Sequence, residues 1–126
     1  MRSPSNAQSV FDRAARHLLR QNQPSTDDSD NFVYYHHPDD IRKCPVGLFI
    51  NKYSPDIEGL PWGDKKVRAC LEFSPSGMVV ALLFALQEMH ADVLVECWPD
   101  ELRRIARDFH LNDHVTKEHH AVHKAP

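Results

Sequence analysis

Residues 78–89 read M-V-V-A-L-L-F-A-L-Q-E-M, and this stretch decides the fold of the 126-residue chain. Apolar side chains occupy almost every position, so a helix formed here is apolar on most of its surface and belongs at the centre of a core. The apolar run is too short for a membrane span, which needs about 20 residues. We therefore predict a soluble, cytoplasmic protein built around this helix, with no membrane partner.

Two amphipathic helices are predicted on either side of this stretch. In both, apolar residues recur every three to four positions, which is the spacing of one helix face. The first is expected at residues 4–21, with Ser3 as N-cap and Pro4 in the first turn. The second is expected to begin at Trp98 and to stop near Asn112. The two stripes consist of Val10, Phe11, Ala14, Ala15, Leu18 and Leu19, and of Trp98, Leu102, Ile105, Ala106 and Phe109.

A short β-hairpin is predicted between the first helix and the apolar stretch. Residues 32–35 (F-V-Y-Y) and 46–50 (V-G-L-F-I) are β-branched and aromatic, which favours strands. The Pro38-Asp39-Asp40 sequence between them is typical of a turn. Residues 64–73 fit either a strand or a short helix capped by Asp64, and we prefer the helix. The predicted fold class is α+β, a mostly helical small domain with three to four helices around a short β-hairpin.

Composition indicates one domain without a dedicated nucleic-acid surface. The apolar and charged fractions, 41% and 26%, are ordinary for a globular protein. A single globular domain is expected at residues 1–112, containing a mobile loop at 22–31, followed by a His-rich flexible tail at 113–126. The formal charge of −3 makes nucleic acid an unlikely partner.

The most distinctive stretch outside the predicted helices is residues 41–63, which holds three of the four glycines. Gly47, in a predicted strand, suits either a close approach of a neighbouring backbone or a bulge, and Gly59 suits a turn with positive φ. We expect the loop at residues 44–63 to lie in an ordered form against the helix at 78–89. Exposed Tyr and Trp side chains are common interaction anchors. The candidate binding residues of this loop are Tyr53, Asp56, Glu58 and Trp62.

Several short patterns spread along the chain resemble a family of short, uncharacterised bacteriophage and prophage proteins. The most specific is K-C-P-V-G-L followed by Ile50, with Tyr53 and then Glu58-Gly59. Further likeness lies in the first helix, in Leu86-Gln87 with His90, and in the final helix, so that it covers residues 9–111. Ala91 stands where the family tends to carry an Asp directly after the histidine. The resemblance implies an α+β fold, a phage-linked origin and a host or phage protein as partner, but no mechanism.

Two functional hypotheses follow. The first is a non-enzymatic protein-binding or regulatory module that acts through the ordered loop 44–63. The alternative is a small enzyme or metal-binding protein that uses Cys44, Glu58 and His90, with His36 or His37 nearby. A catalytic cysteine needs a lowered pKa. More often, a buried cysteine is a packing residue and a loop glutamate accepts backbone N–H groups. Likewise, a cluster of Gln87, His90 and His17 can serve to fix helix register.

Cysteine and histidine spacing predicts no cofactor and no dedicated metal site. Cys44, Cys70 and Cys97 are far apart in sequence and are expected to be reduced thiols. His119 and His123 are four residues apart and would chelate zinc or nickel if the tail were helical. Without a packed scaffold around them, such histidines bind metal only weakly.

Overall fold

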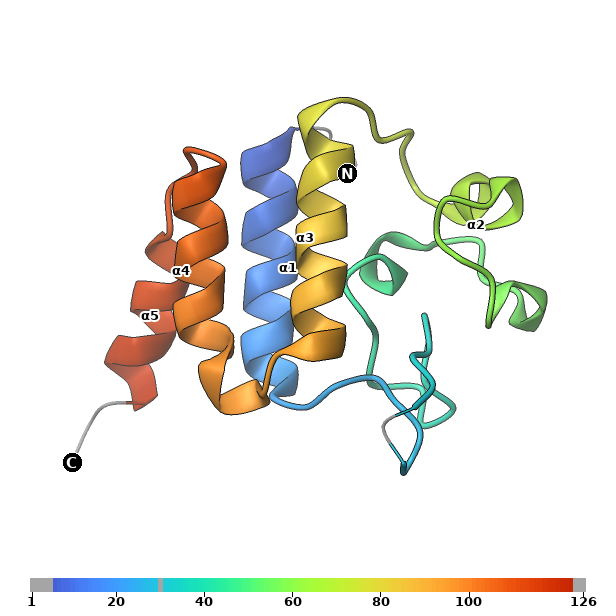
Figure 1. The fold of residues 1–126 in the computed structure, drawn as a ribbon, viewed down its shortest axis with the longest axis horizontal. Helices are drawn as coiled ribbons and strands as arrows, with labels where there is room; N and C mark the ends of the chain where they lie inside the picture. Colours follow the sequence, from blue (N-terminus) through green and yellow to red (C-terminus); the bar gives the residue numbers. More distant parts are fainter. Residues whose placement is uncertain (1–5, 30, 124–126) are drawn as a thin grey trace.

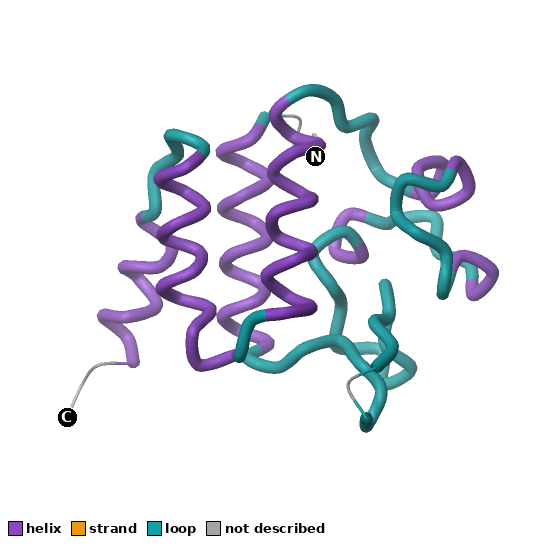
Figure 2. The backbone as a smooth tube through the Cα atoms, viewed as in Figure 1, coloured by secondary structure: helices purple, strands orange, loops and turns teal. Residues whose placement is uncertain are grey.

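The computed structural model describes residues 6–29 and 31–123, with the side chains of 119–123 excepted. Figure 1 shows three long helices side by side: α1 (Ala7–Gln21), α3 (Met78–Asp92) and α4 (Trp98–Asp108). A further helix, α5 (His114–His123), packs against α1 and α4. The chain between α1 and α3 lies beyond α3, on the side away from α4, and is mostly loop (Figures 1 and 2).

Helix α1 buries its whole predicted stripe and contacts α3, α4 and α5. Its N-cap is Asn6, whose side chain accepts a hydrogen bond from the backbone N–H of Ser9 at 2.8 Å. The predicted cap, Ser3-Pro4, lies outside the described residues. Helix α4 begins at Trp98, with proline in its first turn, as predicted. The two amphipathic helices are therefore confirmed.

Helix α3 is less enclosed than its composition predicts. One side packs on α1 and α4, through Val79, Leu82, Leu83, Leu86, Met89 and His90. On the rest of its surface Met78 and Phe84 are 53% and 51% exposed. The expectation that this helix forms the centre of the core is thus wrong for one face, and α1 and α4 each contact three other α-helices.

The predicted β-hairpin and the α+β fold class are wrong. No sheet forms among the described residues, which contain only the isolated bridges Thr26↔Val33, His36↔Lys43 and Ile50↔Leu71. Residues 46–50 instead contain a 3₁₀ turn, η1 (Gly47–Phe49). The physical reason is that the Glu58 carboxylate takes the backbone N–H groups of Tyr35 and His36. These donors cannot also pair with a second strand.

Shorter helical elements complete the segment between α1 and α3. Helix α2 (Lys65–Cys70) begins at Asp64, whose side chain accepts from the N–H of Lys66 at 2.8 Å. This confirms the preference for a helix over a strand at 64–73. The 3₁₀ turn η2 (Pro55–Ile57) follows Ser54. A further 3₁₀ turn, η3 (Val95–Cys97), lies outside this segment, between α3 and α4.

The chain does not end its packed structure at Asn112. Residues predicted to form a flexible tail start helix α5, in which Val115 and Thr116 are buried. The Gln8 side chain holds the connection, because it donates to the Asn112 carbonyl at 3.0 Å and accepts from its N–H at 2.9 Å. The buried surface seen in the described part of α5 is too small to produce a visible apolar period. The mobility of the loop at 22–31 stays a prediction.

Candidate binding pocket

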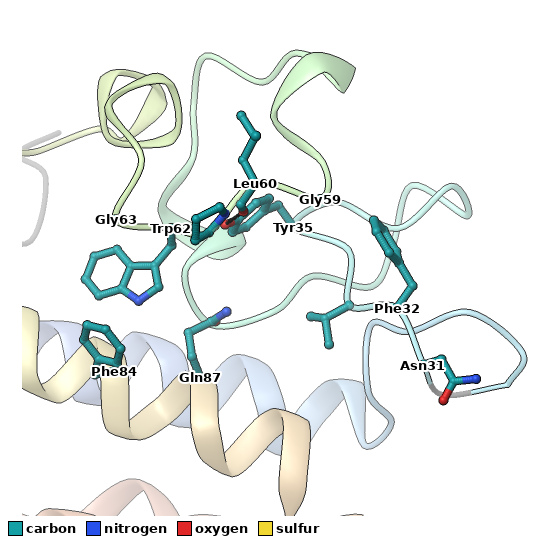
Figure 3. Close-up of a pocket in the computed structure, with 11 residues that line it drawn as sticks. Asn31, Phe32, Tyr35, Gly59, Leu60, Trp62, Gly63, Phe84 and Gln87 are labelled. Carbon is teal, nitrogen blue, oxygen red and sulfur yellow. Dashed lines mark hydrogen bonds between the residues drawn. The ribbon is translucent and has the colours of Figure 1, made fainter.

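A pocket of about 580 Å³ opens between residues 31–35, residues 59–63 and helix α3 (Figure 3). Ligand pockets in proteins commonly measure about 300–1,000 Å³ and are mostly apolar. Its lining combines aromatic and aliphatic side chains with two glycines and two amides. The lining residues are Asn31, Phe32, Val33, Tyr35, Gly59, Leu60, Pro61, Trp62, Gly63, Phe84 and Gln87.

Trp62 forms one wall of this pocket and is not the exposed anchor that we predicted. Only 6% of the residue is exposed. The Arg68 guanidinium carbon lies 4.4 Å from the indole centroid, and the Phe84 ring centroid lies 5.3 Å away. Stacking of a large indole on a cation and an aromatic ring explains this burial. The apolar group that reaches solvent here is Phe84 instead.

Glu58 holds the wall opposite α3 together. Its carboxylate accepts the N–H of Tyr35 at 2.9 Å, the N–H of His36 at 3.1 Å and the Tyr53 hydroxyl at 2.7 Å. The Tyr35 hydroxyl donates in turn to the carbonyl of Leu60 at 2.5 Å. Two lining residues, Tyr35 and Leu60, are thereby fixed to each other. Glu58 has the structural role that is usual for a loop glutamate.

Both glycine predictions are confirmed. A Cβ on Gly47 would lie 1.9 Å from the carbonyl oxygen of Tyr35, so the two backbones can approach only at glycine. Gly59 has φ +86°, in the left-handed region that favours glycine. The His36 Nε2 atom, 2.8 Å from the Gly47 carbonyl oxygen, adds a contact beside this approach.

Gln87 connects α3 to the loop at 44–63. Its Oε1 accepts the N–H of Val46 at 2.8 Å. Together with the contact between Trp62 and Phe84, this confirms that the loop lies against the helix at 78–89. The polar end of an otherwise apolar helix therefore positions the loop.

Two other predicted binding residues lie outside the pocket lining. Tyr53 is 37% exposed, and its ring stacks on His36 with centroids 4.3 Å apart. Asp56 is exposed, as expected of the freer carboxylate in the loop. Of the four candidates, Trp62 lines the pocket and Glu58 braces it, while Tyr53 and Asp56 do neither.

The proposed catalytic group of Cys44, Glu58 and His90 is not assembled. Cys44 is fully buried, and burial raises the pKa of its thiol to about 12. His90 is also buried, and its Nε2 accepts the N–H of Ser25 at 2.9 Å. No hydrogen bond in the described part of the chain joins His90 to the other two. A nucleophile and its base must lie within hydrogen-bond reach, so these three residues do not form a catalytic group. An enzymatic function stays a prediction.

The histidines of the described residues make local structural contacts. His37 Nε2 lies 3.0 Å from the Thr26 carbonyl oxygen, and the His90 ring stacks on Trp98. Burial, together with a smaller contribution from His17, lowers the pKa of His90 to about 4. Among described residues, no group of three possible ligands could hold a metal. The side chains of His119 and His123 lie outside the described residues.

Sequence reasoning missed the residues that shape the pocket opposite Trp62. Phe32 and Tyr35 were expected in a strand, and Phe84 was expected in the core. These side chains come from segments about fifty positions apart, and no spacing pattern links them. The aromatic character of residues 32–35 was the one signal that pointed to this region.

Comparison of the chain with family models, curated proteins and solved structures finds no match. No helix in the described part of the chain is long and apolar enough to cross a membrane. The functional argument therefore depends on the geometry of the pocket and on the side chains around it.

Proposed function

We propose that the protein is a non-enzymatic binding module that takes an apolar side chain of a partner protein into the pocket beside α3. The observation that supports this most is the pocket itself, an apolar hollow of about 580 Å³ walled by aromatic rings. Phe84 lies half-exposed in its lining. Aromatic residues around a hollow are typical of the energetic centre of protein interfaces.

The walls of the pocket are braced before any partner arrives. Glu58 holds Tyr35, Tyr35 holds Leu60, and Gln87 holds the loop at Val46. A braced site loses little conformational entropy on binding, which favours affinity for a given contact area. The site therefore suits recognition by insertion of a side chain into a shaped hollow.

The partner is proposed to be a host protein or another phage protein, met in the cytoplasm. This identity depends on the likeness to bacteriophage and prophage proteins. The proposal replaces the exposed surface of Tyr53 and Trp62 by the pocket as the contact region, since Trp62 is buried.

The proposal can be tested by filling the pocket. A Cβ placed on Gly63 meets no atom within 4 Å, and its φ lies outside the left-handed region, so the backbone accepts a side chain here and Gly63→Leu adds one at the pocket lining. The control is Ala91→Leu, which adds the same side chain at an exposed position of α3 outside the lining. Peptides selected on the wild-type protein from a random library are then titrated into both variants.

We expect the selected peptides to share a large apolar residue and to bind Gly63→Leu at least about tenfold more weakly, a loss of about 1.4 kcal/mol. Their affinity for Ala91→Leu should equal that for the wild type. Thermal unfolding of both variants establishes that they are folded. Selected peptides that bind Gly63→Leu as tightly as wild type would show that the pocket is not the binding site.

A further inference from the structure

We infer that the group bound in the pocket presents a neutral hydrogen-bond acceptor, a main-chain carbonyl oxygen beside the inserted apolar side chain. The inference rests on the proposed function and names the chemistry of the partner at that site. Its basis is that two side chains of the pocket lining, Trp62 and Gln87, carry N–H groups that can donate to a bound group.

The first donor is the indole N–H of Trp62. This nitrogen is buried and has no hydrogen-bond partner among the described residues. An indole nitrogen can only donate, so its missing partner must be an acceptor. Buried polar groups without a partner are rare, and each calls for a physical explanation. In Figure 3 the nitrogen lies on the edge of the ring that faces Phe84 and Gln87.

Phe84 controls access to this nitrogen. Its ring lies against the indole, with centroids 5.3 Å apart, yet the residue is 51% exposed. Side chains with this exposure change rotamer within nanoseconds and lose little packing when they do so. Rotation of Phe84 toward solvent uncovers the indole N–H from the pocket side. A bound apolar group would then occupy the place of the ring.

The second donor is the side-chain amide of Gln87, which also lines the pocket. Its oxygen is occupied by the N–H of Val46 at 2.8 Å. The amide nitrogen carries two hydrogens, and both can donate. In Figure 3 this nitrogen points into the space below Tyr35. Gln87 thus adds a second N–H toward the same hollow.

The acceptor is neutral because no charged side chain is found among the described residues that line the pocket. Burying a carboxylate without a cation costs a large solvation free energy, and hydrogen bonds from two neutral N–H donors recover only a small part of it. Arg68 stacks on the indole but is not part of the lining. A carbonyl oxygen has two lone pairs and so can accept from both donors. An extended protein segment carries such an oxygen next to every side chain.

The test uses the indole signals of the protein in a ¹H–¹⁵N spectrum. The chain has two tryptophans, and Trp98 already donates its indole N–H to the Val93 carbonyl at 3.0 Å, which makes it an internal control. The probes are 4-phenylbutan-2-one, 3-phenylpropanoate and 3-phenylpropylammonium, which share one apolar body. We expect the ketone to move the Trp62 signal downfield and to leave that of Trp98 unchanged. The carboxylate and the ammonium should bind at least about tenfold more weakly.

Trp62→Phe keeps an aromatic wall and removes the donor. We expect it to weaken binding of the ketone at least about fivefold more than binding of butylbenzene, which has no acceptor and loses only packing. Equal binding of all three polar probes without movement of the Trp62 signal would overturn the acceptor inference and leave the pocket standing. If no probe binds and selected peptides ignore Gly63→Leu, both the inference and the proposed function are overturned.

Discussion

The helical bundle and the segment between α1 and α3 are stabilised in different ways. In the bundle, the periodic apolar stripes of the helices pack against one another. Phe11 and Leu18 of α1, for example, are fully buried. In residues 22–77, single side chains satisfy backbone donors far away in sequence. Glu58 does so for Tyr35 and His36, and Gln21 does so for Lys43 at 2.8 Å. The conformation of a loop can therefore be as well defined as that of a helix, but it is defined by individual contacts.

This difference predicts where a small change does the most damage. A bundle spreads its stability over many apolar contacts, so one altered residue removes only part of it. The conformation of the loop segment depends on a few contacts that no other residue can replace. Its sensitive positions are therefore a glycine and a glutamate, and the largest effects are expected there.

The largest effect is expected from Gly47→Ala. The added Cβ would lie 1.9 Å from the Tyr35 carbonyl oxygen, which is backbone and cannot rotate away. We expect a loss of about 4 kcal/mol or more in the free energy of unfolding, measured by chemical denaturation. Gly63→Ala is the matched control, because its Cβ meets nothing within 4 Å, and it should stay within about 0.5 kcal/mol of wild type. Similar costs for the two variants would contradict the close approach at Gly47.

The next effect is expected from Glu58→Ala, which leaves the N–H groups of Tyr35 and His36 without their acceptor. Bonds to a charged acceptor contribute more than neutral ones, so we expect a loss of about 3 kcal/mol. Tyr53→Phe removes only the hydroxyl that donates to the same carboxylate and should cost about 1 kcal/mol. Denaturant unfolding measures both. A Glu58→Ala variant no less stable than Tyr53→Phe would contradict the bracing role of Glu58.

A smaller, pH-dependent effect is expected where the loop meets the bundle at His90. Burial lowers the pKa of His90 in the folded state to about 4, against 6.5 for the ordinary side chain. The unfolded chain therefore takes up a proton first as the pH falls, so the folded state loses stability from pH 6.5 down to about 4 and no further below it. Between pH 6.5 and 5 the loss should reach about 2 kcal/mol.

The control for this prediction is His90→Gln, which keeps an acceptor for the Ser25 N–H but does not titrate. Its unfolding free energy should depend less steeply on pH in the same window. Part of the dependence should remain, because burial also lowers the pKa of His17. Identical slopes for wild type and His90→Gln would show that the pKa of His90 is the same in the folded and unfolded states.

The sequence was informative where structure is periodic. The stripes of α1 and α4 and the cap of α2 at Asp64 could be predicted because each depends on residues within one or two turns. Helix α5 was missed because its buried surface is only Val115 and Thr116 in the described part. A contact this small leaves no apolar period to detect.

The loop segment could be predicted only in part. Gly47 and Gly59 showed where the backbone needs special geometry, but not which neighbour requires it. The hairpin failed because Glu58, which follows Tyr35 by more than twenty positions, takes the donors of the expected strand. The pocket was missed for the same reason, since Trp62 and Phe84 meet only in the folded chain.

The most direct test of the account is amide hydrogen exchange at Tyr35 and His36. These amides lie in no helix and no sheet, yet their N–H groups point at the Glu58 carboxylate and fix a wall of the pocket. The account predicts that both exchange at least about a hundredfold more slowly than in an unstructured chain, and that Glu58→Ala abolishes this protection. Exchange at the unstructured rate in the wild-type protein would contradict the central claim that this loop is an ordered, braced wall.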